Sequence, residues 1–142
     1  MGGQIQPIKK IVRQASTRID HERDEFAQTL GITGTRMSVI DFLSNQENNS
    51  ASQNAIEQEF NIQRSTTTVM LQRMEKRELV ERIASPTDRR QKMVKLTEKA
   101  QVLVAQIHEY MKNDDMNLRK QFTNRELKIT RRVLLIIKNG KY

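Results

Sequence analysis

The sequence contains no cysteine and no tryptophan, and only two prolines and five glycines among its 142 residues. Without cysteine, the chain can form no disulfide, no thiol switch and no cysteine-ligated metal site. So few helix-breaking residues predict a mostly helical protein. No apolar run approaches the roughly 18 residues of a membrane-spanning helix, and no secretory signal pattern follows the first residues. We therefore expect a cytoplasmic protein that does not enter a membrane.

Positive charge, by contrast, is abundant and unevenly distributed, with a net charge of +8. Residues 61–99 contain ten Lys or Arg and five Asp or Glu. Residues 112–142 contain nine Lys or Arg and three Asp or Glu. A basic balance is informative about partners rather than about fold. It favours nucleic acid and leaves an anionic membrane surface as the second alternative. A basic protein with neither partner is the third.

Apolar residues at helical spacing divide the chain into a series of predicted helices. The first runs for about 20 residues from Pro7 and is ended by Gly31, and a second follows Thr33. A polar loop is expected over residues 46–50. Ser52 is a preferred N-cap residue for a short third helix, and Asn61, which tolerates the left-handed conformation, ends it.

A fourth helix is predicted over residues 64–77, and the spacing of its apolar residues assigns its faces. Thr67, Met70, Leu71 and Met74 follow the spacing i, i+3, i+4, i+7 and are expected to face the core. The opposite face is small, polar and basic, and it comprises Arg64, Ser65, Thr66, Thr68, Val69, Gln72 and Arg73.

The pattern then changes to two short β-branched or apolar segments, residues 79–83 and 93–96, separated by a turn-rich stretch that predicts a hairpin. Thr97 caps a long fifth helix. Thr123 and Glu126 match the capping box of a last helix that ends before Gly140. The continuous apolar run at residues 133–137 is expected to be buried against another element.

A short helix, a tight turn and a helix with a polar outer face describe a helix-turn-helix. In that motif the second helix enters the major groove of DNA. Gln pairs with adenine, Arg with guanine, and Val69 suits a thymine methyl. Helix starts supply N–H groups to phosphate, which makes Ser52 and Gln53 candidate phosphate contacts.

The hairpin loop is the second candidate contact and carries Arg89, Arg90 and Lys92. A thin cationic loop can enter a narrow minor groove, where negative potential is concentrated. The short side chain of Asp88 is expected to pair with Arg90 and orient it. A solvated polar helix start and a basic surface turn without a partner are the alternatives to these two assignments.

Residues 85–90, Ser-Pro-Thr-Asp-Arg-Arg, are followed by Val-Lys-Leu-Thr at 94–97. This pattern resembles the wing signature of the MarR (multiple antibiotic resistance regulator) family of transcription factors. Residues 63–66 and 73–80 resemble that family's recognition helix and its exit, and the likeness covers nearly the whole chain. Glu78 and Ala100 stand where glycine is frequent. A non-glycine residue at a positive φ costs about 1 kcal/mol, so the turn at Glu78 is expected to differ.

The resemblance implies a mainly α fold with a small β-hairpin wing (α+β), a winged helix-turn-helix flanked by dimerisation helices. Residues 1–31 and 101–142 would form the dimerisation region and residues 32–100 the DNA-binding domain. Two recognition helices roughly 34 Å apart would read a pseudo-palindromic operator. The lean apolar content of 36% agrees with burial completed by a second copy.

Two further expectations concern this dimer. Basic residues of the last helix would pair with acidic residues of the partner's first helix, namely Arg125, Lys128, Arg131 and Arg132 with Asp20, Glu22, Asp24 and Glu25. A small amphipathic or phenolic effector would bind between the dimer helices and the winged domain. Met37, Met111 and Met116 are candidates to line that site or, alternatively, to fill the core.

No pattern for catalysis is found. His21 and His108 have no neighbours at metal-ligand spacing, the pair His21 and Glu25 is typical of a solvated helix contact, and no phosphate-binding glycine loop exists. We expect no enzyme, no cofactor and no metal. The predicted function is a sequence-specific DNA-binding regulator, acting as a homodimeric repressor that an effector releases. The alternatives are a nonspecific or architectural nucleic-acid-binding protein and a protein-interaction module.

Overall fold

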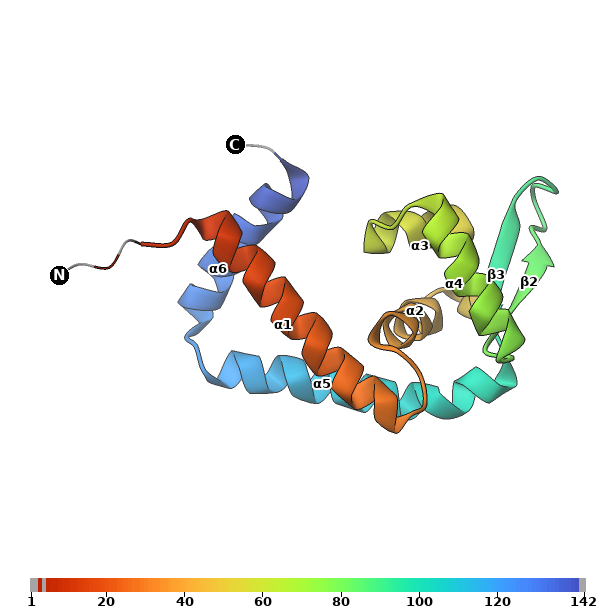
Figure 1. The fold of residues 1–142 in the computed structure, drawn as a ribbon, viewed down its shortest axis with the longest axis horizontal. Helices are drawn as coiled ribbons and strands as arrows, with labels where there is room; N and C mark the ends of the chain where they lie inside the picture. The colour runs from red at the N-terminus through yellow and green to blue at the C-terminus, as the bar shows by residue number, and fades with distance from the viewer. Residues whose placement is uncertain (1–2, 4, 141–142) are drawn as a thin grey trace. The chain divides into compact units, whose positions relative to one another are not determined.

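The computed structural model describes residue 3 and residues 5–140. Along the chain the elements are α1 (Ile8–Thr29), α2 (Gly34–Ser44), the 3₁₀ turn η1 (Glu47–Asn49), β1 (Ser50–Ser52), α3 (Gln53–Phe60), α4 (Arg64–Lys76), β2 (Val80–Ala84), β3 (Lys92–Leu96), α5 (Glu98–Lys120) and α6 (Asn124–Asn139) (Figure 1). Within the described residues, no helix has both the length and the apolar character needed to cross a bilayer. The predicted mainly α fold with a small β-hairpin wing is confirmed.

The chain consists of two compact units, residues 1–105 and residues 106–142. The first contains every element from α1 to the start of α5, and the second contains the remainder of α5 and all of α6. The predicted division into a dimerisation region and residues 32–100 remains a prediction.

The helices begin and end where short-range chemistry favours it. Thr33 caps α2 by accepting a hydrogen bond from the N–H of Arg36 at 3.3 Å, and Ser52 caps α3 by accepting one from Ala55 at 3.1 Å. Such caps satisfy N–H groups that have no partner within the helix. Asn61 ends α3 at φ 50°, the left-handed conformation expected for it.

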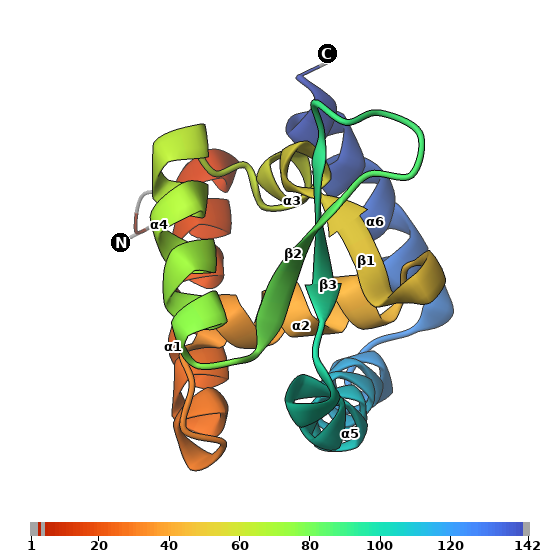
Figure 2. The same ribbon diagram turned by 90° about the vertical axis from the view of Figure 1, so that its right-hand side faces the viewer.

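The sheet has three antiparallel strands in the order β1-β3-β2, and the β2–β3 loop extends beyond them as the wing (Figure 2). In β2 and β3, Val80 pairs with Leu96 and Ala84 with Lys92. The expected polar loop at residues 46–50 is wrong in part, because η1 and the start of β1 occupy it. Ser50 pairs with Lys95 on the other edge of β3. A strand of three residues is too short to show a period in the sequence.

The core of the first unit lies between α2, α3, α4 and the sheet. Its fully buried side chains include Met37, Val39, Ile40, Leu43, Ile56, Leu71, Met74 and Val94. Burial of each large apolar side chain contributes about 1.5–3 kcal/mol. Met37 is therefore a core residue, the simpler of the two roles that the sequence left open for it.

The last helix, α6, begins with the predicted capping box. Thr123 Oγ1 accepts from the N–H of Glu126 at 3.1 Å, and the Glu126 carboxylate accepts from the N–H of Thr123 at 3.0 Å. The expected burial of residues 133–137 is not found within one chain. Val133, Leu134 and Leu135 are 42–48% exposed, and no described side chain of α6 is buried. The described residues of one copy therefore leave this apolar face open.

Candidate nucleic-acid interface

The α3-turn-α4 unit presents the face of α4 that the sequence predicted. Thr67, Leu71 and Met74 are fully buried and Met70 is half-buried. The exposed residues of the helix include Arg64, Ser65, Thr66, Val69, Gln72 and Arg73. Val69 is 46% exposed, so its methyl groups are presented among hydrogen-bonding side chains, as a thymine contact requires.

Thr68 differs from the other residues assigned to this face because it is half-buried. Its Oγ1 accepts a hydrogen bond of 2.8 Å from the side-chain amide of Gln53. Gln53 is the first residue of α3, so this bond joins the starts of α3 and α4. The bond therefore fixes the side chains of Thr68 and Gln53 relative to each other, while both residues remain partly exposed to solvent.

A polar hollow of about 510 Å³ lies between the wing and the first turns of α3 and α4. We call it the wing groove, and its lining residues are Ser52, Gln53, Asn54, Arg64, Thr68, Arg90, Gln91 and Lys92. Six of these were predicted as contacts from the sequence. Asn54 and Gln91 were not, because their positions give no periodic signal. The hollow combines three cationic side chains with the start of a helix, which suits a phosphate group.

The wing loop is held in shape by its own polar groups. Ser85 is buried, and its Oγ accepts from the N–H groups of Thr87 and Asp88 at 3.3 and 3.2 Å. The Asp88 carboxylate accepts from the main-chain N–H of Arg90 at 2.9 Å. The expected pairing of Asp88 with Arg90 therefore involves the backbone rather than the guanidinium group. The side chains of Arg89 and Arg90 are exposed.

The base of the wing is fixed to α4 and α5. Arg82 of β2 lies 2.7 Å from the Glu75 carboxylate of α4. Thr97 Oγ1 donates to the carbonyl of Glu78 at 2.6 Å and accepts from the N–H of Ala100 at 3.2 Å. Glu78 adopts φ 60°. The turn at Glu78 therefore keeps the left-handed backbone conformation that glycine would favour, in spite of its side chain.

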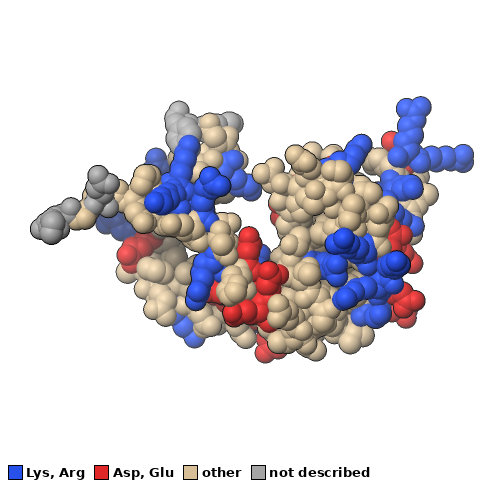
Figure 3. Space-filling model, in the orientation of Figure 1, with Lys and Arg blue, Asp and Glu red and all other residues tan. Residues whose placement is uncertain are grey.

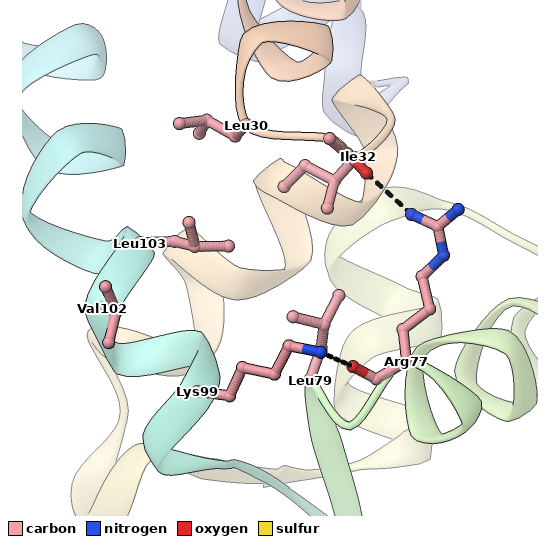
Figure 4. A pocket seen from close by; sticks show the side chains of 8 residues that line it. Leu30, Ile32, Arg77, Leu79, Lys99, Val102 and Leu103 are labelled. Atoms are coloured by element: carbon pink, nitrogen blue, oxygen red, sulfur yellow. Dashed lines mark hydrogen bonds between the residues drawn. The ribbon is translucent and has the colours of Figure 1, made fainter.

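A second hollow of about 500 Å³, which we call the α4–α5 cavity, lies behind the end of α4 (Figure 4). Its lining residues are Leu30, Gly31, Ile32, Arg77, Leu79, Lys99, Val102 and Leu103. Arg77 donates to the carbonyl of Gly31 at 2.7 Å, and Lys99 Nζ donates to the carbonyl of Arg77 at 2.9 Å. The cavity thus has apolar walls and two cationic side chains at its edge.

Among the described residues, no group of three or more His, Asp or Glu side chains is arranged to hold a metal ion. His21 Nε2 lies 3.0 Å from the Glu25 carboxylate, and both side chains are more than 60% exposed. This pair is the solvated helix contact that the sequence predicted.

The arrangement of α2, α3, α4 and the β2–β3 wing defines a winged helix-turn-helix. The MarR family model matches residues 30–91. The transcription regulator MarR from Oenococcus oeni PSU-1 is 35% identical, with a TM-score of 0.83 over 94% of this chain and 99% of that chain. The chain therefore belongs to the MarR family, whose members are transcription regulators and not enzymes.

More distant structures share the fold. MepR of S. aureus in a DNA complex gives a TM-score of 0.86 at 18% identity, over 96% of this chain and 99% of that chain. A mutant MarR from E. coli complexed with operator DNA gives a TM-score of 0.78 at 22% identity, over 92% of this chain and 93% of that chain. No curated protein matches the sequence.

Proposed function

We propose that this chain is a sequence-specific DNA-binding transcriptional repressor that acts as a homodimer in the cytoplasm on a pseudo-palindromic operator. The observation that carries the proposal is the position of the wing groove beside the exposed face of α4. Base-reading side chains and cationic phosphate contacts thus lie on one continuous surface. Specific recognition needs both, because phosphate contacts position a protein and base contacts select the sequence.

In this mechanism α4 enters the major groove. Ser65, Thr66, Val69 and Gln72 contact base edges, and Arg73 lies one turn beyond Val69. Thr68 reaches the groove edge while it remains bonded to Gln53. Arg89 and Arg90 at the wing tip enter the neighbouring minor groove, and Asp88 fixes the backbone that carries them. Ser52, Gln53 and Lys92 in the wing groove contact phosphate.

The homodimer is supported by apolar surface that one copy leaves uncovered. Ile8, Ile11 and Ile19 of α1 are 44–60% exposed, and α6 exposes Ile129, Val133 and Leu135 to a similar degree. Burial of such surface drives association at about 25 cal/mol per Å². A dimer would also place two copies of α4 on successive turns of one face of the DNA.

The proposed ion pairs between α6 and the partner's first helix have less support. Three of the four acidic residues already have partners within the chain. Asp24 accepts from Gly34, Glu22 lies 3.1 Å from Arg18, and Glu25 pairs with His21. An exposed ion pair within the chain is weak, so only such a pair could be replaced at low cost by an ion pair with the partner. Apolar contact is therefore the main attraction in the proposed dimer.

A small amphipathic effector is also part of the proposal, and the α4–α5 cavity is where we place it. Cavities of roughly 300–1,000 Å³ with apolar walls and a few polar groups are typical of small-molecule sites. A ligand with an aromatic body and an anionic or phenolic group would match the apolar walls and Lys99. Since the cavity lies against the end of α4, its occupation would shift the recognition helix and weaken operator binding.

The decisive experiment is selection of bound duplexes from a random pool by the full-length protein. We expect a two-fold-symmetric motif, bound at least ~10³ times more tightly than unrelated duplex. The Arg89→Ala/Arg90→Ala variant should lose affinity and show a shallower salt dependence, whereas Lys112→Ala/Lys120→Ala, which removes two exposed charges from α5, serves as a charge-matched control. No enriched motif would indicate nonspecific binding, and unchanged binding by the wing variant would favour a protein-interaction module.

The effector proposal has its own test with benzoate and phenol as probes. Both should raise the unfolding midpoint of the wild type and release the selected duplex, because a ligand stabilises the state it binds. Lys99→Met should weaken the response to benzoate more than the response to phenol. Equal responses of the two proteins would place the effector elsewhere.

A further inference from the structure

Arg64 is the first residue of α4, and its side chain is paired with Glu57 of α3. Arg64 Nε lies 3.8 Å from Glu57 Oε2. One helical turn away on both helices, the side chain of Gln53 donates to Thr68 Oγ1 at 2.8 Å. Residues four apart lie on the same side of a helix, so Gln53 and Glu57 share one face of α3. Two successive side-chain contacts therefore fix the start of α4 to α3.

The two members of the Glu57–Arg64 pair differ in burial. The side chain of Glu57 is 12% exposed, whereas that of Arg64 is 78% exposed. Glu57 Oε2 is buried without a hydrogen-bond partner, and among the described residues Arg64 is the only cation within 4 Å of this carboxylate. A buried charge without a partner is costly. Glu57 therefore restrains Arg64 at Nε, and the terminal amino groups of the arginine remain free for another ligand.

The carboxylate of Glu57 distinguishes Arg64 from the other two cations of the wing groove. Within the part of the chain that the structure describes, Arg90 and Lys92 have no carboxylate within 4 Å. Figure 3 shows Lys and Arg side chains gathered over the region of α4 and again at the wing tip. The charge of Glu57 repels a phosphate, whereas O6 and N7 of guanine are neutral acceptors that an arginine binds through two hydrogen bonds. Arg90 and Lys92 thus suit phosphate, and Arg64 suits a base edge.

We propose that Glu57 is a positioning residue that holds Arg64 towards a base edge, and that Arg64 thereby selects a guanine in the operator. This inference rests on the proposed function and adds to it a residue of α3 that is not part of the wing-groove lining. Arg64 stands where a recognition helix meets base edges, which is its N-terminal end. A restrained side chain loses less freedom on binding, while an unrestrained arginine would also bind phosphates, which carry no sequence information. Glu57 therefore raises base preference and lowers affinity for unrelated DNA.

The test begins by repeating the duplex selection with Arg64→Ala. One position at which the wild type prefers guanine should lose that preference. The wild type and Glu57→Gln are then compared on the selected duplex, on a duplex with that G·C pair replaced by A·T in both half-sites, and on an unrelated duplex. The wild type should prefer guanine about tenfold or more, since such a contact discriminates by roughly 5- to 150-fold. Glu57→Gln should lose most of this preference but bind the unrelated duplex at least as tightly, because it carries one negative charge fewer.

The matched control is Glu59→Gln, which makes the same change of charge on the same helix. Glu59 is exposed and has no cation within 4 Å among the described residues. This variant should keep the guanine preference, and Glu57→Asp should keep part of it. An unchanged preference in Glu57→Gln would overturn the proposal, as would selection of the wild-type motif by Arg64→Ala. A loss of affinity that is equal on the selected and altered duplexes would overturn it too, since that would assign Glu57 a structural role. If the wild type itself selects no motif, the proposed function fails, and this inference fails with it.

Discussion

The side-chain amide of Gln53 donates a hydrogen bond of 2.8 Å to Oγ1 of Thr68. The two residues are fifteen positions apart, and the bond links the first residue of α3 to the second turn of α4. Both residues line the wing groove. The geometry of the wing groove and the orientation of α4 are therefore coupled through one hydrogen bond.

This coupling predicts that Thr68→Val weakens both folding and binding. Valine keeps the shape of threonine but removes the acceptor, which leaves the amide of half-buried Gln53 without its partner. We expect a loss of about 1 kcal/mol in the free energy of unfolding, measured by urea denaturation, together with weaker binding of the selected duplex.

Thr68→Ser should restore most of the stability, because the hydroxyl is retained. Thr66→Val is the matched control on the exposed side of α4 and should leave the free energy of unfolding unchanged. A Thr68→Val protein as stable as the wild type would show that the bond contributes nothing in solution.

Glu78 is the second position where the structure predicts the direction in which a substitution changes the free energy of unfolding. Its φ of 60° is unfavourable for a residue with a Cβ, and its side chain is exposed, 4.0 Å from Lys99 Nζ. Exposed pairs at such a distance contribute little. Glu78→Gly should therefore raise the free energy of unfolding by about 1 kcal/mol.

The control for Glu78 is Asn61→Gly. Asn61 has a similar φ of 50°, but asparagine tolerates the left-handed conformation. This substitution should leave the unfolding midpoint close to that of the wild type. A lower stability of Glu78→Gly would mean that the carboxylate of Glu78 makes a contribution that outweighs backbone strain.

Local patterns in the sequence were sufficient to predict the helices and the exposed face of α4. Ser52, Thr97 and Thr123 cap helices where expected, because capping depends on residues three positions apart. The strand β1 was missed, since it is defined only by its pairing with β3, more than forty residues later.

The candidate site was predictable to the same extent. The periodicity of α4, the predicted start of α3 and the charge of the wing identified the exposed face of α4 and six of the residues that line the wing groove. The bond between Gln53 and Thr68 and the main-chain contact of Asp88 depend on how the chain folds around them. No spacing within the sequence encodes these contacts, so they required the structure.

Gly34 is predicted to be essential for the packing of α1 against α2. A Cβ atom at Gly34 would lie 2.7 Å from Asp24 Oδ1 and 3.0 Å from the main-chain nitrogen of Asp24. The backbone of α1 cannot yield as a flexible side chain can. We expect Gly34→Ala to lower the free energy of unfolding by about 1–3 kcal/mol, measured by denaturant titration.

The comparison for Gly34 is Gly31→Ala. Gly31 has open space where a Cβ would stand but a φ of 75°, so its substitution tests backbone strain without a clash. A loss of about 1 kcal/mol is expected there. If Gly34→Ala were no more harmful than Gly31→Ala, α1 and α2 would approach each other less closely than the structure shows.

The carboxyl group of Glu126 is expected to make the stability of the protein depend on pH. Its carboxylate accepts hydrogen bonds from the N–H and then the hydroxyl of Thr123, and these lower its pKa from the usual 4.5. A carboxyl group whose pKa is lower in the folded state stabilises that state above the unfolded pKa. This contribution is lost as pH falls through the folded pKa. The wild type should therefore become less stable as pH falls below about 4.5.

The substitution that tests this is Glu126→Gln, because glutamine keeps an acceptor for the capping box but carries no charge. At neutral pH its unfolding midpoint should fall slightly below that of the wild type, since an acid at a helix start is favourable. The difference between the two proteins should shrink as the pH is lowered. An NMR titration gives the pKa of Glu126 directly, and a value at or above 4.5 would contradict the capping geometry.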